Sequence, residues 1–301
     1  MSDSAQPLRD LAPQHAFFIG IDSDGCAFDT MELKHKECFA PNTIKHWGLQ
    51  PVSKYARDAA LFVNLYSKWR GINRWPALVM VLDLLRERDE VIRRGVTIPQ
   101  ADSLRAFIAQ EKYPHSDSGL RAYMAEHPGD PDLERGLAWT TAINDAVADM
   151  VVGVSPFPFV RESLIDMQNK ADMIVVSATP NRALEQEWNE HGIAQYMRMI
   201  AGQEYGSKTV CLGAAAAGRY DPDKILMIGD APGDMKAAKA NGALFYPVNP
   251  GDEERSWERF YNEAMGRFFD CAYAGEYEAA LIREFETYLP DTPPWKRGAA
   301  G

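Results

Sequence analysis

Long apolar runs and closely spaced cysteines are both missing from this sequence. No run reaches the roughly 18 apolar residues that a membrane-spanning helix needs. The 4 cysteines are widely spaced and include no Cys-x-x-Cys pair, which favours free thiols in a reducing compartment over a disulfide framework. The first eleven residues lack the apolar segment of a signal peptide. We therefore expect a soluble, cytoplasmic protein that does not associate with membranes.

Positive charge is also scarce. The 32 Lys and Arg residues are outnumbered by 43 Asp and Glu residues, and the net charge is −11. This balance argues against nucleic acid as a partner, and an anionic substrate would need local positive charge or a metal ion. Apolar residues are plentiful, at 46% of 301 residues, which is enough to bury the core of one large domain or two smaller ones. The oligomeric state cannot be predicted from these features.

The stretch from Phe17 to Gly25 combines an apolar run with two carboxylates. The apolar residues are typical of a short buried strand, and Asp22 and Asp24 follow at its carboxyl end. Side chains alternate along a strand, so both carboxylates point the same way if the extended geometry persists. Two such acids in a ligand crevice need a cation, a shared proton or separate roles. An ordinary Asx turn before a flexible glycine is the alternative.

Residues 31–154 show helical periodicity and no convincing strand. Apolar residues recur at three- and four-residue spacing, as at Leu78, Val81, Leu82 and Leu85. The region ends before a Pro-Phe-Pro break at 156–158. We therefore predict a helical module that is inserted after the first strand.

Strands return later in the chain and alternate with helices. We predict strands at 173–176, 197–201, 225–228 and 243–246, and helices at 180–191, 207–217 and 233–240. Such alternation indicates βαβ units and a parallel sheet. The predicted fold class is therefore α/β, with residues 1–29 and 155–301 forming the core and residues 30–154 forming a second, all-helical domain.

Two further helices are expected before the chain ends. The first carries an aromatic stripe that includes Trp257, Phe260 and Phe268. We expect this stripe to pack on the sheet, with a dimer interface as the alternative. Residues 289–301 are rich in Pro and Gly and are expected to be irregular.

Polar residues follow the predicted strands or begin the predicted helices. Ser177 follows the strand at 173–176, Lys208 lies at a helix start, and Asp230 and Asp234 follow the strand at 225–228. Each has an ordinary explanation: a helix N-cap for Ser177, for which Thr179 competes, a solvated lysine, and a turn with a cap.

Taken together, these residues have a more specific explanation. The carboxyl ends of parallel strands share one edge of a sheet, so four acids, one hydroxyl and one lysine would meet there. Several carboxylates in one crevice favour a hard cation, and a phosphate partner favours Mg²⁺.

The order of these residues resembles the four motifs of the haloacid dehalogenase superfamily. The motifs are a strand followed by Asp22-x-Asp24-Gly25, a strand followed by Ser177, then Lys208, and a strand followed by Gly229-Asp230-x-x-x-Asp234. The resemblance covers nearly the whole chain, and the helical insertion stands where this superfamily carries a cap domain. It implies a Rossmann-like α/β core. One departure is Cys26, where threonine or valine is more usual; a small apolar filler or a redox-sensitive thiol would explain it.

The resemblance also implies a role for each motif. Asp22 would attack phosphorus and form an aspartyl-phosphate, and Asp24 would protonate the leaving oxygen and then activate water. Ser177 and Lys208 would bind the phosphoryl oxygens.

The same resemblance implies the metal ligands and the reaction class. Asp22, the Asp24 backbone carbonyl and Asp230 would hold Mg²⁺, with Asp234 binding directly or through water. An acid at position 24 indicates phosphate esters, because members that cleave halides or phosphonates have no oxygen leaving group to protonate. We expect a phosphomonoesterase acting on a small phosphorylated metabolite whose identity the sequence does not indicate. A phosphomutase and a non-catalytic binding scaffold are the alternatives.

Substrate specificity is expected to come from the cap. The segment from Asn64 to Pro76 contains Lys68, Arg70 and Arg74 together with two tryptophans and two asparagines. These cations would bind the polar part of an anionic substrate. The alternative is an ordinary corner between two helices.

Overall fold

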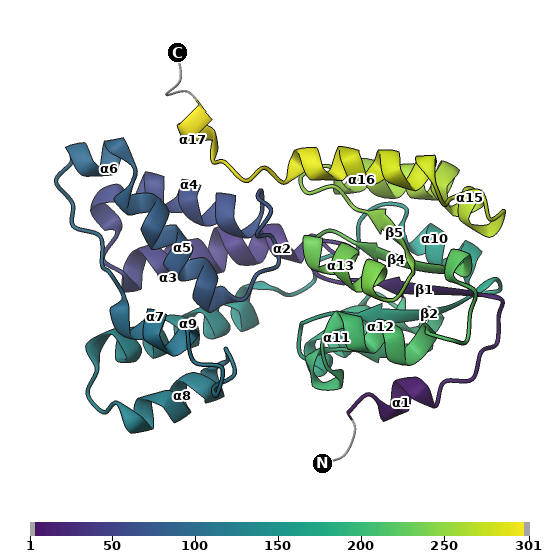
Figure 1. Ribbon diagram of the computed structural model, residues 1–301, viewed down its shortest axis with the longest axis horizontal. Helices are drawn as coiled ribbons and strands as arrows, with labels where there is room; N and C mark the ends of the chain where they lie inside the picture. The colour runs from purple at the N-terminus through teal and green to yellow at the C-terminus, as the bar shows by residue number, and fades with distance from the viewer. Residues whose placement is uncertain (1–3, 298–301) are drawn as a thin grey trace. The chain divides into compact units, whose positions relative to one another are not determined.

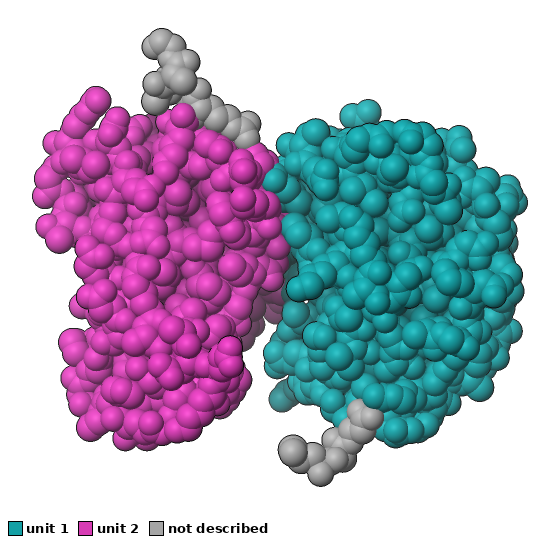
Figure 2. Space-filling model, viewed as in Figure 1, with its two compact units in different colours: residues 1–31, 153–289 teal, residues 32–152, 290–301 magenta. Residues whose placement is uncertain are grey.

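The computed structural model describes residues 4–297 as two compact units (Figure 1). One unit comprises residues 1–31 and 153–289, and the other comprises residues 32–152 and 290–301 (Figure 2). Among the described helices, none combines the length and the apolar character that crossing a membrane requires.

The first unit contains a five-stranded parallel sheet in the order β3-β2-β1-β4-β5. Its strands are β1 (Phe17–Ile21), β2 (Ala171–Val176), β3 (Met199–Ala201), β4 (Ile225–Gly229) and β5 (Leu244–Pro247). This is the α/β fold that the alternating pattern predicted, with the first strand at the centre of the sheet. The predicted strands begin and end within two residues of these bounds.

Helices cover both faces of the sheet (Figure 1). The unit contains α1 (Gln6–Arg9), α10 (Val160–Met167), α11 (Asn181–Glu190), α12 (Lys208–Ala216), α13 (Pro232–Ala240), α14 (Glu253–Arg259), α15 (Met265–Phe269) and α16 (Glu276–Tyr288). A π-helical stretch, Phe260–Ala264, joins α14 to α15, and short 3-10 turns lie at Ala194–Tyr196, Gln203–Tyr205 and Pro222–Lys224.

Alternation along the central strand explains why its sequence is apolar throughout. Ile19 and Ile21 face one layer of the core, whereas Phe18 faces the other with Leu212 of α12. Both faces are covered, so every position must be apolar or small. The aromatic stripe packs as predicted, because Trp257 is fully buried in the same layer as Ile19 and Ile21.

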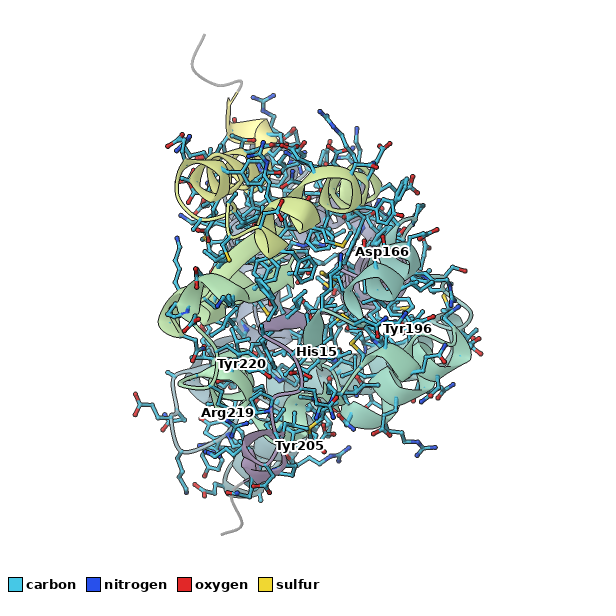
Figure 3. The ribbon with its side chains drawn as sticks, turned by 90° about the vertical axis from the view of Figure 1, so that its right-hand side faces the viewer. His15, Asp166, Tyr196, Tyr205, Arg219 and Tyr220 are labelled. Carbon is cyan, nitrogen blue, oxygen red and sulfur yellow. The ribbon has the colours of Figure 1, made fainter. Side chains whose placement is uncertain are left out.

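A polar cluster stabilises the edge of the sheet where the strands begin, which Figure 3 views with His15 and Tyr220 labelled. Asp172 on β2 is almost fully buried. It accepts hydrogen bonds from the backbone nitrogens of Gln14 and His15, at 2.8 and 3.0 Å, from the Tyr220 hydroxyl at 2.7 Å, and from Arg198. The cluster thereby attaches the segment before β1 to the sheet.

The second unit is helical, and no strand is assigned between residues 32 and 152. Its helices are α2 (Thr30–Leu33, which spans the boundary of the units), a π-helix at Lys34–Phe39, α3 (Ala40–His46), a 3-10 turn at Gln50–Val52, α4 (Ser53–Asn64), α5 (Arg74–Arg86), α6 (Asp89–Arg93), α7 (Asp102–Ile108), α8 (Asp117–Glu126) and α9 (Pro131–Met150). Trp75 lies at the centre of its core, with ring centroids 5.4 Å from Trp139 and 5.9 Å from Phe107.

The C-terminal segment belongs to the helical unit, whereas the sequence placed all of 155–301 in the core. Its short helix α17 (Pro294–Arg297) carries Trp295, which packs edge-on against Phe62 and lies under the Arg88 guanidinium. The reason for the difference is a contact between residues more than 200 positions apart, which local composition does not encode. The last four residues, 298–301, lie outside the described part of the chain.

Candidate active site

The motif residues meet where three neighbouring strands end. Ile21 pairs with Val175 on one side and with Ile228 on the other. The residues that follow β1, β2 and β4 therefore emerge side by side, and the backbone nitrogen of Asp22 still donates to the Ile228 carbonyl at 3.0 Å. This register places Asp22, Ser177 and Asp230 at one edge of the sheet, as expected for an α/β fold.

Three carboxylates form a buried cluster at this edge. Asp22, Asp230 and Asp234 each offer one oxygen, and these oxygens all lie within 4.8 Å of one another. All three residues are buried. A cluster of oxygen ligands with this charge fits a hard divalent cation.

Lys208 bridges two members of the cluster. Its Nζ lies 2.6 Å from Asp22 Oδ2 and 2.6 Å from Asp234 Oδ1. Lys208 is the first residue of α12, whose N-cap is Ser207. The start of the helix therefore fixes the backbone from which the Lys208 side chain extends. The ordinary explanation of a solvated lysine is wrong here, because the ammonium group lies among buried acids.

The cluster contains more acidic groups than basic ones. Burial raises the pKa of Asp22 well above its usual value; Lys208 opposes this effect, while Asp234 and Asp230 add to it. Burial likewise raises the pKa of Asp234. Burial alone would lower the pKa of Lys208, but the neighbouring carboxylates, Asp22 first, raise it instead. One ammonium faces three carboxylates, so added positive charge would stabilise the ionised acids.

Asp234 reaches the cluster by lying across Gly229. It is on the first turn of α13, and its Oδ2 accepts a hydrogen bond from the Ala231 nitrogen at 3.0 Å. A Cβ on Gly229 would lie 2.3 Å from the Asp234 Cβ. A glycine is therefore required at the end of β4 for this carboxylate to reach Lys208.

Asp24 is held apart from the three clustered acids. Its Oδ2 accepts a hydrogen bond from the Thr179 hydroxyl at 2.5 Å, and its Oδ1 accepts one from the Thr30 hydroxyl. The turn that follows contains Gly25 at a φ of +75°, a conformation that favours glycine. Asp22 and Asp24 thus face different partners, which gives the two acids separate environments.

Ser177 directly follows β2 and is buried. Its nitrogen donates to the Ala201 carbonyl at 3.0 Å, and its Oγ accepts a weak hydrogen bond from the Thr179 nitrogen at 3.2 Å. The N-cap of α11 is Pro180, which has no side-chain cap. Neither Ser177 nor Thr179 therefore serves as the N-cap that the ordinary interpretation assigned.

Cys26 is fully buried beneath the site. Burial raises the pKa of its thiol well above the usual value, with Asp230 and Asp22 adding to the effect. Its carbonyl accepts a hydrogen bond from Trp257 Nε1 at 2.7 Å. A buried, protonated thiol supports the interpretation as a small filler, because reactive cysteines need thiolate character and access.

The three cations singled out in the helical unit differ in exposure. Arg70 is 3% exposed and donates to the Leu65 carbonyl at 3.0 Å. Arg74 donates to Thr140 Oγ1 and to Asn144 Oδ1, both at 2.8 Å. The Lys68 side chain is 51% exposed, and its Nζ lies 3.6 Å from Asp291 Oδ2. Arg70 and Arg74 are thus engaged within their own unit, and Lys68 is the most accessible of the three.

The residues that orient Asp24 carry little signal in the sequence. Thr30 gave no local signal, because it lies six residues away in an unremarkable stretch. Thr179 has the sequence features of a possible N-cap. Its position two residues after Ser177, at the same edge of the sheet, was the signal that could have linked it to Asp24.

A family model described as haloacid dehalogenase-like hydrolase matches residues 105–248. No curated protein matches the chain. Among solved structures, a haloacid dehalogenase-like family protein from Streptococcus pneumoniae is 16% identical, with a TM-score of 0.43 over 82% of this chain and 90% of that one. A haloacid dehalogenase-like family hydrolase from Xanthomonas campestris is 11% identical, with a TM-score of 0.42 over 92% and 95%.

The matched range bears directly on the motifs. It contains Ser177, Lys208, Asp230 and Asp234, and the register of the sheet brings Asp22, which precedes it, to the same cluster. The match confirms the resemblance over residues 105–248, which contain the second, third and fourth motifs.

Proposed function

We propose that this chain is a Mg²⁺-dependent phosphomonoesterase that acts through an aspartyl-phosphate on Asp22. The observation that carries the proposal is the buried cluster of Asp22, Asp230 and Asp234 around Lys208, with Asp24 held separately. A nucleophilic carboxylate, a separate acid and a compensating cation are the groups that phosphoryl transfer through an aspartate requires.

The residues of the cluster fit a divalent cation. Their oxygens are close enough to share one ion, and Lys208 alone does not balance the charge of three acids. Asp22, Asp230 and the Asp24 carbonyl would hold Mg²⁺, with Asp234 binding directly or through water. The bound ion would supply the positive charge that lets an anionic phosphoryl group approach Asp22.

In the first step, a carboxylate oxygen of Asp22 forms a bond to phosphorus, and the bond between phosphorus and the leaving oxygen breaks. Asp24 gives its proton to that oxygen. In the second step, Asp24 takes a proton from water, which attacks phosphorus and releases Asp22 and inorganic phosphate. Thr30 and Thr179 suit both states of Asp24, because a hydroxyl can donate or accept a hydrogen bond.

Lys208 and Ser177 would bind the phosphoryl oxygens during both steps. The carboxylates raise the pKa of Lys208, so the ammonium keeps its charge at neutral pH. Fixed positive charge at the transferring group stabilises the transition state without rearrangement. For substrate recognition beyond the phosphoryl group, we propose the helical unit, with Lys68 as the candidate contact, because Arg70 and Arg74 are engaged within that unit.

The first experiment measures hydrolysis of an aryl phosphate with Mg²⁺ and with excess EDTA. We expect activity that EDTA abolishes and added Mg²⁺ restores, with Asp22→Asn as the inactive control. Full activity in excess chelator would contradict the metal assignment, and no activity on any phosphate ester would favour a binding scaffold. A screen of sugar phosphates, nucleotides and other small phosphomonoesters would then identify the substrate.

A phosphomutase is separated from a phosphatase by its products. A phosphatase accumulates inorganic phosphate, whereas a mutase returns the phosphoryl group to a second position of the substrate. Measuring both products for the best substrate of the screen distinguishes the two reactions.

A further inference from the structure

We propose that Ser23 is a positioning residue for Asp22, held by Trp188 of α11. The inference rests on the proposed phosphatase activity and deepens it. Ser23 lies between the candidate nucleophile and the candidate acid, in the turn that follows β1, and its hydroxyl is hydrogen-bonded to residues of α11. The side chain enters the core beneath the loop, where it is fully buried.

The Ser23 hydroxyl has two partners on α11. It donates to Glu187 Oε2 at 3.0 Å and accepts from Trp188 Nε1 at 2.9 Å. Trp188 is itself fully buried and packs edge-on against Phe28, with ring centroids 5.6 Å apart. Burying a hydroxyl at such a site costs free energy unless it is hydrogen-bonded. The bonds to Glu187 and Trp188 therefore favour one position of the Ser23 loop.

The backbone of Ser23 transmits that position to Asp22. The Ser23 nitrogen donates to Asp22 Oδ1 at 2.8 Å, while Oδ2 of the same carboxylate contacts Lys208. The Ser23 carbonyl accepts from the nitrogens of Cys26, Ala27 and Phe28, which sets the turn that follows. Movement of Ser23 would therefore move one of the two groups that orient the Asp22 carboxylate.

The segment that holds Ser23 also holds Asp24, the next residue of the loop. Thr179, in the connection between β2 and α11, holds Asp24. The segment from Ser177 to Glu190 thus contains the candidate phosphate-binding serine and contacts both the candidate acid and the residue beside the candidate nucleophile. Because small displacements of a nucleophile slow reactions strongly, we expect this contact to affect chemistry more than substrate binding.

The test uses Ser23→Ala, Trp188→Phe and the double variant in the full-length protein. Trp188→Phe keeps an aromatic ring against Phe28 and removes only the N–H donor. Gln186→Ala, at an exposed position of α11, is the matched control. For each we would measure kcat, KM, the rate of the first turnover with an aryl phosphate, and Tm.

We expect each single variant to lower kcat and the first-turnover rate about tenfold, with KM changed less than twofold. The double variant should be no slower than Ser23→Ala, because Ser23→Ala already removes the hydrogen bonds of the hydroxyl to both Trp188 and Glu187. The control should match the wild type. Unchanged kcat in Ser23→Ala and Trp188→Phe, with Tm alone lowered, would overturn the proposal, and so would additive losses in the double variant.

A readout that does not need turnover separates this proposal from the proposed function. We expect Mg²⁺ to raise the Tm of the wild type and to raise that of Ser23→Ala less, because the Asp22 carboxylate is less well placed. An inactive wild type that shows this difference would refute the phosphatase activity and keep the positioning role. Equal Mg²⁺-induced shifts in the wild type and Ser23→Ala would overturn the positioning role.

Discussion

The two units bury charged groups in different ways. In the α/β unit, Asp22, Asp230 and Asp234 surround a single lysine. In the helical unit, the nearly buried Arg88 lies between the rings of Tyr55 and Trp295, 4.5 and 4.4 Å from their centroids, and also pairs with Asp58 at 3.1 Å. The first arrangement has an excess of one sign, whereas the second surrounds one charge with complementary groups.

We use the difference to distinguish candidate catalytic groups from groups that stabilise the fold. A buried charge that is matched by its surroundings stabilises the fold, whereas an unmatched cluster destabilises it unless a ligand supplies the missing charge. Burial alone does not identify a functional residue. Arg70 shows this, because it is as buried as Asp22 and Ser177 and is engaged within its own unit.

The largest expected effect is that of Asp22→Asn. We expect kcat to fall by about 10³-fold or more, because an amide cannot act as the nucleophile. Stability should be kept or increased, because burial and repulsion raise the pKa of Asp22 and the amide removes that repulsion. Activity assays and thermal unfolding check both parts. Near-wild-type turnover would contradict the covalent mechanism. A large loss of stability would contradict the inference that the unmatched acid cluster destabilises the fold.

Asp24→Asn should have a smaller and more selective effect. We expect kcat to fall about 10²-fold for alkyl phosphates, whose leaving oxygen needs a proton, and less for the first turnover of activated aryl phosphates. Single-turnover rates across a series of leaving groups measure this. Equal losses along the series would show that Asp24 does not act as the acid.

Asp172→Asn tests a matched carboxylate in the α/β unit. Burial alone would raise the pKa of Asp172, but the hydrogen bonds from Gln14, Tyr220, His15 and Arg198 lower it overall. Its stabilising effect is therefore present above the pKa of the unfolded state, about 3.9, and is lost as the pH falls through the lower folded-state value.

For this variant we expect a loss of about 1–3 kcal/mol in unfolding free energy at pH 7. The difference from the wild type should shrink near pH 3, as measured by urea denaturation at both pH values. A difference that does not depend on pH would show that the charge of Asp172 does not contribute.

Arg88→Ala tests the matched charge of the helical unit. We expect a loss of about 2 kcal/mol, from two cation–π contacts and the packing of the side chain. Hydrolysis of a small aryl phosphate should be unchanged. Trp295→Ala should also lower stability, because it removes one of the two rings around Arg88 together with the packing against Phe62, while Arg88 keeps Tyr55 and Asp58. Urea denaturation with parallel activity assays checks both variants. A fall in kcat with unchanged stability would show that Arg88 affects the reaction and does not stabilise the fold.

The smallest effect is expected for Lys68→Ala. We expect KM to rise a few-fold for the best substrate of the screen and to stay constant for a small aryl phosphate, because the half-exposed ammonium contributes only local attraction. Arg70→Ala is the contrasting variant, since its buried side chain should affect stability and leave KM unchanged. If Arg70→Ala raises KM while stability is kept, Arg70 contacts the substrate after all.

Much of the α/β unit could be predicted because its signals are local. The strand before Asp22 is apolar over five residues because both faces of the central strand are covered. Lys208 could be assigned only by its resemblance to a motif, because a lysine at a helix start has an ordinary explanation. Its contacts with Asp22 and Asp234 join residues far apart in the chain.

The parallel sheet, the helical insertion and the order of the motif residues could all be predicted from the sequence, because periodicity and strand ends are properties of neighbouring residues. Three features required the folded structure: Asp24 is hydrogen-bonded to Thr30 and Thr179, Ser23 is held by Trp188, and the C-terminal segment joins the helical unit. Most of these outcomes depend on contacts between distant segments, whose energies are set by burial and hydrogen-bond geometry that appear once the chain has folded.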